Sequence, residues 1–216
     1  MSKDRTQSGQ GAIIIRQARP EDAVVAAELL LLTAEPLLRY LFYGDRSRTL
    51  RVLGELFAMR RNEFTYEDTY LAEVDSQVAG LIRFTNKRKA RADNRGIVSR
   101  MIRVMPLLHI LGRVPRYVHL AWAFAAIGDD AAYIHFLATS PFFRRQGVAR
   151  RLLASCEGWA REIGLLELAL DVEAHNEAAR ALYEAAGFRE SRTLDSSALQ
   201  RAFGFSGVHR MVKRLA

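Results

Sequence analysis

The chain has very little cysteine, with one residue, Cys156, among 216. A single cysteine excludes an internal disulfide framework and is typical of proteins that stay in a reducing compartment. We therefore expect a cytoplasmic protein that is stabilised by an apolar core. Cys156 falls on the apolar stripe of a predicted helix, so we interpret it as a core residue rather than a nucleophile.

The chain also lacks a long hydrophobic run. Its most apolar segment, residues 104–127, is interrupted by Arg113, Pro115 and Arg116, and the longest uncharged stretch there, residues 117–128, has 12 residues. A helix that spans a membrane needs about 20 apolar residues. The sequence therefore predicts a protein that does not enter a membrane.

Residues 1–11 are polar and lack the apolar centre of a signal peptide. We expect a flexible tail there and a single domain over residues 12–216. Positive charge is in excess: 32 Lys and Arg stand against 24 Asp and Glu, a net charge of +8 at pH 7. This excess favours an anionic partner, either nucleic acid, an acidic membrane surface or a polyphosphate cofactor.

Hydrophobic periodicity predicts an α/β chain with a mixed sheet, without the regular alternation of a doubly wound fold. Strands are expected at residues 12–17, 69–84 (a hairpin), 131–139, 165–172, 188–194 and 207–212. Helices are expected from Pro20 onward, at residues 46–61, at 148–163 and over a short segment closed by Gly187. Residues 86–130 are too long for a hairpin loop, so we interpret them as a helical insertion.

The stretch "RRQGVARRLL", residues 144–153, follows a predicted strand and opens a predicted helix at Gly147. The N-terminus of a helix has unpaired backbone N–H groups and a partial positive charge, and glycine lets a phosphate approach the backbone closely. With four arginines nearby, the stretch predicts a pyrophosphate cradle. A solvated basic helix start is the alternative. The Gly-Lys-Ser/Thr of a Walker loop and the three-glycine dinucleotide spacing are both absent.

A second motif, "NEAARALYEAAGF", covers residues 176–188. Together the two motifs resemble the GNAT superfamily of N-acetyltransferases. Arg144, Gly147 and Ala149 match the pattern Arg/Gln-x-x-Gly-x-Gly/Ala. The pattern Asn-x-x-Ala-x-x-Leu-Tyr-x-x-x-Gly-Phe is matched by Asn176, Ala179, Leu182, Tyr183, Gly187 and Phe188. The close match covers about residues 133–192.

The resemblance implies a GNAT fold, in which a mostly antiparallel sheet flanked by helices splays between its fourth and fifth strands. It implies acetyl-CoA as co-substrate, no metal, and direct transfer to an amine. A bulge within residues 136–139 would let backbone N–H groups polarise the thioester carbonyl. The implied cofactor-binding residues are Leu137, Ala138, Thr139, Arg144, Arg145, Gln146, Gly147, Val148, Ala149, Arg150, Asn176 and Tyr183.

The implied catalytic residues are Tyr183, Leu137 and His135. Tyr183 would donate a proton to the leaving thiolate, because a phenol with a pKa of about 10 is protonated at neutral pH. Leu137 would contribute its backbone N–H. Several relatives place a glutamate on or just before the strand at 131–139, which has no acid here. His135 is our candidate base, with Glu73 as the other candidate and a satisfied core histidine as the alternative.

Three functions stay open at this point. The first is an acetyltransferase whose acceptor is a small-molecule or peptide amine. The second is a non-catalytic acyl-CoA-binding or regulatory module on the same fold. The third is a nucleic-acid-binding protein, which no recognisable motif supports, so we expect no nucleic-acid partner. The basic half of the insertion would attract an acidic or phosphorylated partner or lie in solvent, and its aromatic half would line the acceptor site, pack on the sheet or form a homodimer contact.

Overall fold

The computed structural model describes residues 11–42, 44–94, 97–105, 128, 130–195 and 207–215. Seven strands form one sheet in the order β1-β2-β3-β4-β5-β7-β6. They are β1 (Ile14–Gln17), β2 (Thr69–Val74), β3 (Gln77–Asn86), β4 (Ala131–Thr139), β5 (Glu167–Glu173), β6 (Arg189–Asp195) and β7 (Gly207–Arg214).

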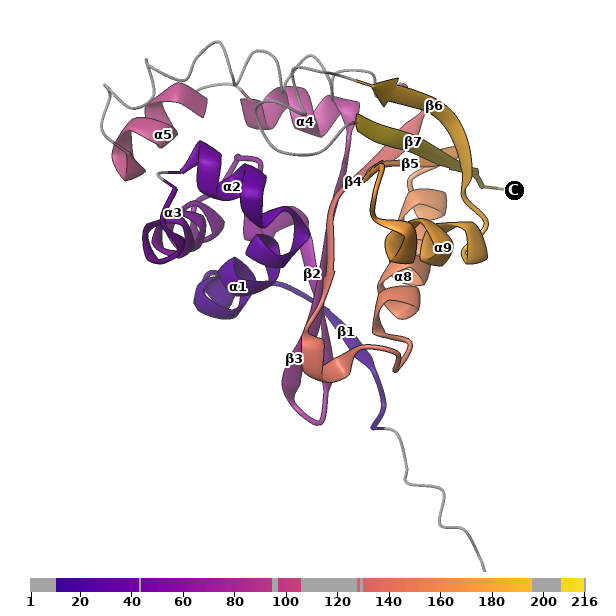
Figure 1. Ribbon diagram of the computed structural model, residues 1–216, viewed down its shortest axis with the longest axis horizontal. Helices are drawn as coiled ribbons and strands as arrows, with labels where there is room; N and C mark the ends of the chain where they lie inside the picture. The colour runs from indigo at the N-terminus through magenta and orange to yellow at the C-terminus, as the bar shows by residue number, and fades with distance from the viewer. Residues whose placement is uncertain are drawn as a thin grey trace, which may run out of the picture.

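The described helices are α1 (Ala23–Thr33), α2 (Glu35–Leu41), α3 (Arg46–Ala58), α4 (Lys87–Asn94), α5 (Ile97–Val104), α8 (Val148–Glu162) and α9 (Glu177–Ala185). Helices α1, α2 and α3 lie on one side of the sheet, and α8 and α9 lie on the other (Figure 1). The predicted α/β class with a mixed sheet is confirmed. No described helix combines the length and the apolar character that crossing a bilayer requires.

The sheet is antiparallel at every junction except one. β4 and β5 run parallel and pair only from Ala131 opposite Glu167 to Ile134 opposite Leu170. Beyond that point β4 continues along β3 as far as Thr139, and β5 continues along β7 as far as Glu173. The two strands therefore splay apart, as the resemblance implied.

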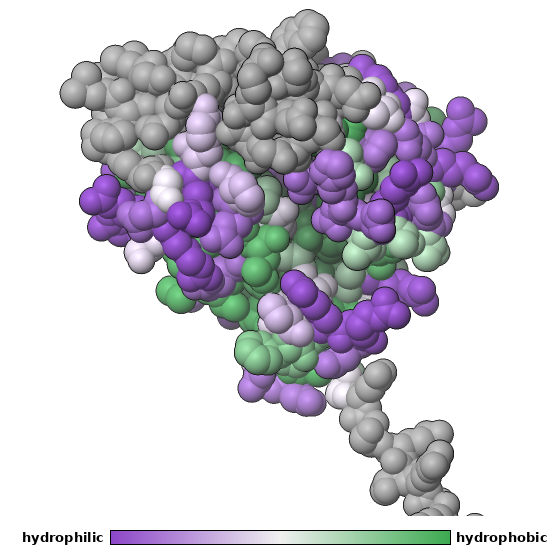
Figure 2. All heavy atoms as spheres, viewed as in Figure 1, coloured by the Kyte–Doolittle hydropathy of each residue, from purple (hydrophilic) through white to green (hydrophobic). Residues whose placement is uncertain are grey.

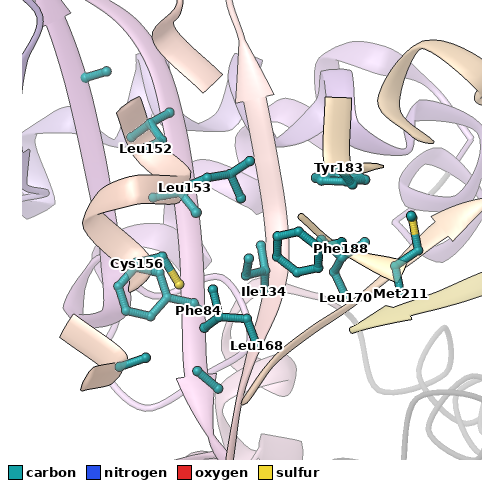
Figure 3. Packing of buried hydrophobic residues seen from close by; sticks show 14 of the residues in the cluster. Phe84, Ile134, Leu152, Leu153, Cys156, Leu168, Leu170, Tyr183, Phe188 and Met211 are labelled. Atoms are coloured by element: carbon teal, nitrogen blue, oxygen red, sulfur yellow. The ribbon is translucent and has the colours of Figure 1, made fainter. Parts of the chain in front are cut away.

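Two apolar cores pack against the two faces. On the α8 side, buried residues of β4, β5 and α8 meet α9 and β7, and Figure 3 shows Ile134, Leu170 and Cys156 among them. On the other side, residues of α1, α2 and α3 pack on β2, β3 and β4. Cys156 is fully buried, and burial raises the pKa of its thiol well above the ordinary value, so it is a core residue as predicted.

Several boundaries differ from the predictions. The first strand begins at Ile14 rather than residue 12, and α3 ends at Ala58, shortly before Arg61 adopts a φ of 58°. The sequence analysis did not predict α2, a seven-residue helix with proline in its first turn. Residues 87–104 hold α4 and α5, in line with a helical insertion. The rest of that insertion, residues 106–127, and residues 1–10 of the tail lie outside the described residues.

Candidate active site

A β-bulge lies where β4 leaves β5. Arg83 of β3 pairs with Phe136, while the next residue, Phe84, pairs with Ile134, so His135 is the extra residue. The predicted position of this bulge within residues 136–139 is therefore wrong, because the pairing from Phe136 to Thr139 is regular. The physical reason is packing: Ile134 and Leu137 both pack on the α8 side although they are three residues apart, which requires one extra residue between them.

The opposite face of the bulge is aromatic. The ring of Tyr133 meets the ring of His135 edge to face at 4.8 Å between centroids. Phe136 stacks on Phe64 at 5.4 Å, and Phe64 in turn meets Phe42 at 5.5 Å. His135 therefore projects toward the α1–α3 side of the sheet, among rings. On the face seen in Figure 2, apolar side chains form a band near the middle of the molecule, between two hydrophilic flanks.

His135 has an acidic partner that the sequence analysis missed. Its Nδ1 lies 3.0 Å from Oε1 of Glu63, which stands in the loop between α3 and β2. The His135 side chain is 10% exposed, and its buried Nε2 has no hydrogen-bond partner in the part of the chain that the structure describes. A carboxylate on one ring nitrogen holds the proton there and leaves the other nitrogen with its lone pair. The geometry is that of an oriented base.

The pKa values of this pair fit that role. Burial lowers the pKa of His135 and outweighs the opposite effect of the Glu63 charge, so the ring is neutral at pH 7. Burial tends to raise the pKa of Glu63, but the interaction with His135 and the positive charge of Arg83 lower it well below its ordinary value. Glu63 is therefore an ionised carboxylate beside a neutral imidazole.

Tyr183 lies on the other side of the opened strands. It projects from α9 into the edge of the α8-side core, where it meets Phe188 edge to face at 5.8 Å (Figure 3). Burial raises the pKa of its hydroxyl to about 12. Within the described part of the chain, the hydroxyl has no hydrogen-bond partner. A buried phenol of this kind keeps its proton at neutral pH and has it free to donate.

The arginine–glycine loop, residues 144–147, joins a short 3-10 helix (Pro141–Phe143) to α8. Arg145 has a φ of 63° and Gly147 a φ of 83°, so the backbone turns twice through the left-handed region before the helix begins. A Cβ built on Gly147 meets nothing within 4 Å, which leaves the backbone open to a ligand. Buried Val148 anchors the start of α8 in the core.

The arginines of this region, Arg144, Arg145, Arg150 and Arg151, are exposed, and none forms an ion pair with a described residue. Gln146 donates from its side chain to the carbonyl of Phe142 at 3.2 Å and braces the loop. An accessible backbone at a helix N-terminus, surrounded by unpaired cations, fits a pyrophosphate. The residues present are thus compatible with the diphosphate of coenzyme A.

The remaining predicted site residues are placed as follows. Asn176 caps α9, because its side-chain oxygen accepts from the backbone N–H of Ala179 at 3.1 Å. Beyond the bulge, Leu137 packs toward the α8 side, Ala138 toward the α1–α3 side, and Thr139 ends the strand. Glu73 bonds Arg16 on β1 at 2.7 Å, and β3 separates it from β4. Among the described residues no group of acidic, histidine or cysteine side chains could hold a metal.

A mixed sheet that opens between a parallel pair of strands, with a histidine–glutamate pair at the bulge and an arginine–glycine loop before α8, is in line with the fold that the two motifs imply. The chain belongs to the acetyltransferase (GNAT) family, whose model matches residues 39–188. This confirms the resemblance carried by the two motifs.

Curated relatives match a shorter stretch. An uncharacterized N-acetyltransferase, YycN of Bacillus subtilis, is 38% identical over 71 residues, which is 33% of this chain and 46% of the relative. The [ribosomal protein bS18]-alanine N-acetyltransferase of Escherichia coli K12 is also 38% identical over 71 residues, 33% of this chain and 48% of the relative. An aminoglycoside N(6')-acetyltransferase of Acinetobacter genomosp. 13 is 33% identical over 63 residues, 29% of this chain and 43% of the relative. The chain thus spans less than half the length of each.

Among solved structures, an N-acetyltransferase from Staphylococcus aureus Mu50 superposes with a TM-score of 0.67 at 19% identity. The match covers 92% of this chain and 99% of that one. At this identity the likeness shows the fold alone, and it agrees with the sheet order and the splayed strands described above.

Proposed function

We propose that this chain transfers the acetyl group of acetyl-CoA directly to an amine of a small-molecule or peptide acceptor. One observation carries the proposal: a buried, neutral His135 stands at the bulge where β4 leaves β5, with Nδ1 on a carboxylate and Nε2 without a partner among the described residues. The open arginine–glycine loop supports the donor, because it suits a diphosphate.

The residues would divide the chemistry as follows. Backbone amides of residues 145–150 hold the pyrophosphate, the side-chain amide of Asn176 contacts the donor, and backbone N–H groups of Leu137 and Ala138 polarise the thioester carbonyl. Past Ile134, β4 has no pairing with β5, so the opened edge is available to the donor. The donor supplies an activated acetyl group, and the protein supplies its orientation.

Two proton transfers accompany the reaction, and we propose His135 as the base and Tyr183 as the acid. A lysine-like amine has a pKa of about 10.4, so generating its neutral form at pH 7 costs roughly 4–5 kcal/mol. His135 Nε2 would accept that proton, and the ionised Glu63 would stabilise the imidazolium that results. Tyr183 would donate its proton to the departing thiolate, which its raised pKa permits up to strongly basic pH.

Two of the relatives are named for their acceptors, which are an aminoglycoside and the alanine of a ribosomal protein. Both are amines, which is the level at which we propose the acceptor of this chain. The single cysteine, reduced and buried, is in keeping with a cytoplasmic location, where we propose the enzyme acts.

The test is thiol release from acetyl-CoA by the purified chain with a panel of small amines, aminoglycosides and peptides with free N-termini. Turnover with at least one amine, lost in His135→Asn, is the expected result. Binding of acetyl-CoA without turnover for every amine would instead favour the non-catalytic acyl-CoA-binding module.

A further inference from the structure

Among the described residues, Arg83 is the largest side chain that is fully buried, at 0% exposure. It lies on β3, opposite Phe136 and beside the bulge. An ionised guanidinium in the interior is costly unless it is paired and hydrogen-bonded, and an apolar side chain of similar size often stabilises such a site as well or better. Stability alone therefore gives no reason for a cation here.

The guanidinium reaches the loop that carries Glu63. Its Nη2 donates to the backbone carbonyl of Asn62 at 3.2 Å and lies 4.0 Å from Oε2 of Glu63. The other carboxylate oxygen, Oε1, faces His135 at 3.0 Å. Glu63 thus stands between a buried cation and the imidazole, with one oxygen toward each.

The backbone on both sides of Glu63 is fixed. The buried side chain of Asn62 donates to the carbonyls of Leu56 and Met59, both at 2.9 Å, and accepts from the N–H of Phe64 at 2.8 Å. Phe64 is held further by its stacking on Phe136. The loop therefore holds the backbone of Glu63 in one place, although its side chain is 38% exposed.

We infer that Arg83 is a positioning residue, which holds the Glu63 carboxylate against Nδ1 of His135 and so keeps Nε2 as the proton-accepting nitrogen. The inference rests on the proposed role of His135 as the base. It assigns Arg83 no contact with substrate. It also gives the buried cation a reason, because the carboxylate that orients the ring then has a cation on its other oxygen.

The charges near His135 act on its pKa in opposite directions. Burial lowers it most; the Glu63 carboxylate raises it, and the Arg83 cation lowers it. The other ionisable groups that face it are Asp68, which raises the pKa, Tyr133 on β4, and behind that ring Asp171 of β5 and Arg210 of β7. Asp171 and Arg210 form a buried ion pair, and the hydroxyl of Tyr133 donates to Asp171 at 2.8 Å. Removing the charge of Glu63 is thus expected to lower the pKa of His135, and removing the charge of Arg83 is expected to raise it.

The experiment follows the titration of His135 by NMR in the full chain with labelled histidine, assigned by the signal that His135→Asn removes. Glu63→Gln is expected to move the midpoint to lower pH. The double variant Glu63→Gln/Arg83→Gln is expected to move it back up relative to Glu63→Gln, because the opposing cation is gone. The double variant also avoids a lone buried charge, so the effect of Arg83 can be measured even if Arg83→Gln alone does not fold.

Arg83→Lys keeps the positive charge and is the matched control, with a midpoint above that of Glu63→Gln and near that of the unchanged chain. The acid limb of kcat/KM, measured with any amine that the chain acetylates, is expected to follow the same order. In Arg83→Gln, which keeps Glu63, the ring ¹⁵N shifts are expected to show the proton of neutral His135 moving from Nδ1 toward Nε2; Arg83→Met serves if that variant does not fold. An unchanged proton on Nδ1 in these variants, with turnover still lost in His135→Asn, would overturn the inference and leave the proposed function intact. A proton that moves to Nε2, with full turnover in His135→Asn, would support the inference about Arg83 and sink His135 as the base.

Discussion

Tyr183 combines two properties that rarely occur together in a core tyrosine: its ring is buried, and its hydroxyl is unpartnered among the described residues. A hydroxyl that stabilised the fold would need a hydrogen bond, since an unsatisfied buried polar group costs free energy. The Tyr183 hydroxyl is not one of the fully buried polar atoms that lack a partner, so solvent or a ligand can reach it. Such access is what the proposed proton donation requires.

Replacing Tyr183 with Phe is expected to lower kcat by roughly 10²–10⁴-fold, the usual contribution of a positioned acid. The free energy of unfolding should change little, because the hydroxyl has no partner to lose. Steady-state kinetics with acetyl-CoA and thermal unfolding measure the two effects. An acyl donor with a more acidic thiol needs less help to leave, so it should narrow the difference in kcat between the unchanged chain and Tyr183→Phe. An undiminished kcat in Tyr183→Phe would show that the residue is not part of the mechanism.

His135 makes a separate prediction about stability and pH. Its pKa in the folded chain is lowered by burial, so the unfolded chain takes up a proton more readily than the folded chain as pH falls below about 6.5. The stabilisation that neutral His135 provides is present above that pH and is lost as the pH falls. His135→Asn should therefore flatten the decline in the free energy of unfolding between pH 7 and pH 5, measured by urea titration. An unchanged decline would show that other groups cause it.

The sequence predicts some site residues and not others, for physical reasons. Tyr183 and Gly147 belong to short contiguous motifs whose spacing follows a helix and its start. Glu63 lies in a loop, far along the chain from His135, and only the tertiary fold brings the two together. The position of the bulge could not be read from alternation, because Ile134, Phe136 and Leu137 are all apolar.

At the scale of elements, helix α8 has one glycine at its start and another in its interior. Gly147 precedes the helix with a φ of 83°, whereas Gly158 lies inside it. A Cβ built on either one meets nothing within 4 Å, so the two sites differ in backbone conformation and not in space. They form a matched pair for testing the arginine–glycine loop.

Gly147→Ala is expected to destabilise the chain by about 1 kcal/mol, because a residue with a Cβ resists the left-handed conformation. It should also weaken acetyl-CoA binding, since the backbone turn that opens the N–H groups is altered. Gly158→Ala should stabilise the chain by roughly 0.5–1 kcal/mol, because alanine favours a helix interior, and should leave binding unchanged. Titration calorimetry measures the binding of acetyl-CoA, and thermal unfolding measures the stability of each variant. Equal effects of the two substitutions on binding would contradict the proposal that the arginine–glycine loop holds the diphosphate.

Elements were predicted with uneven success. β4 was predicted over its observed range, since its apolar run is bounded by Asp130 and Pro141. α2 was missed because seven residues make fewer than two helical turns and give periodicity little to act on. The β2–β3 hairpin was predicted within residues 69–84, and its two-residue turn is Asp75–Ser76, both with positive φ.

For the whole molecule, the net charge of +8 and the unpaired arginines beside Gly147 point to one anionic ligand. Acetyl-CoA at 100 times its dissociation constant should raise the free energy of unfolding by about 2.7 kcal/mol, visible as a higher melting temperature. The increase should shrink at high salt, because screening weakens the arginine contacts. Salt-sensitive binding of nucleic acid that acetyl-CoA does not displace would instead revive the nucleic-acid-binding function.

The short parallel junction between β4 and β5 also has a consequence for the order of assembly. β1 to β4 all precede residue 140, and β5 to β7 all follow residue 166, so each half of the sheet is one continuous piece of chain. During synthesis the first half has all its strands, and the Glu63–His135 pair, before Tyr183 has been made. The two halves join through four pairs of residues and helix α8. The proposed donor site draws on both halves, so it cannot be complete until the chain has been made as far as Tyr183.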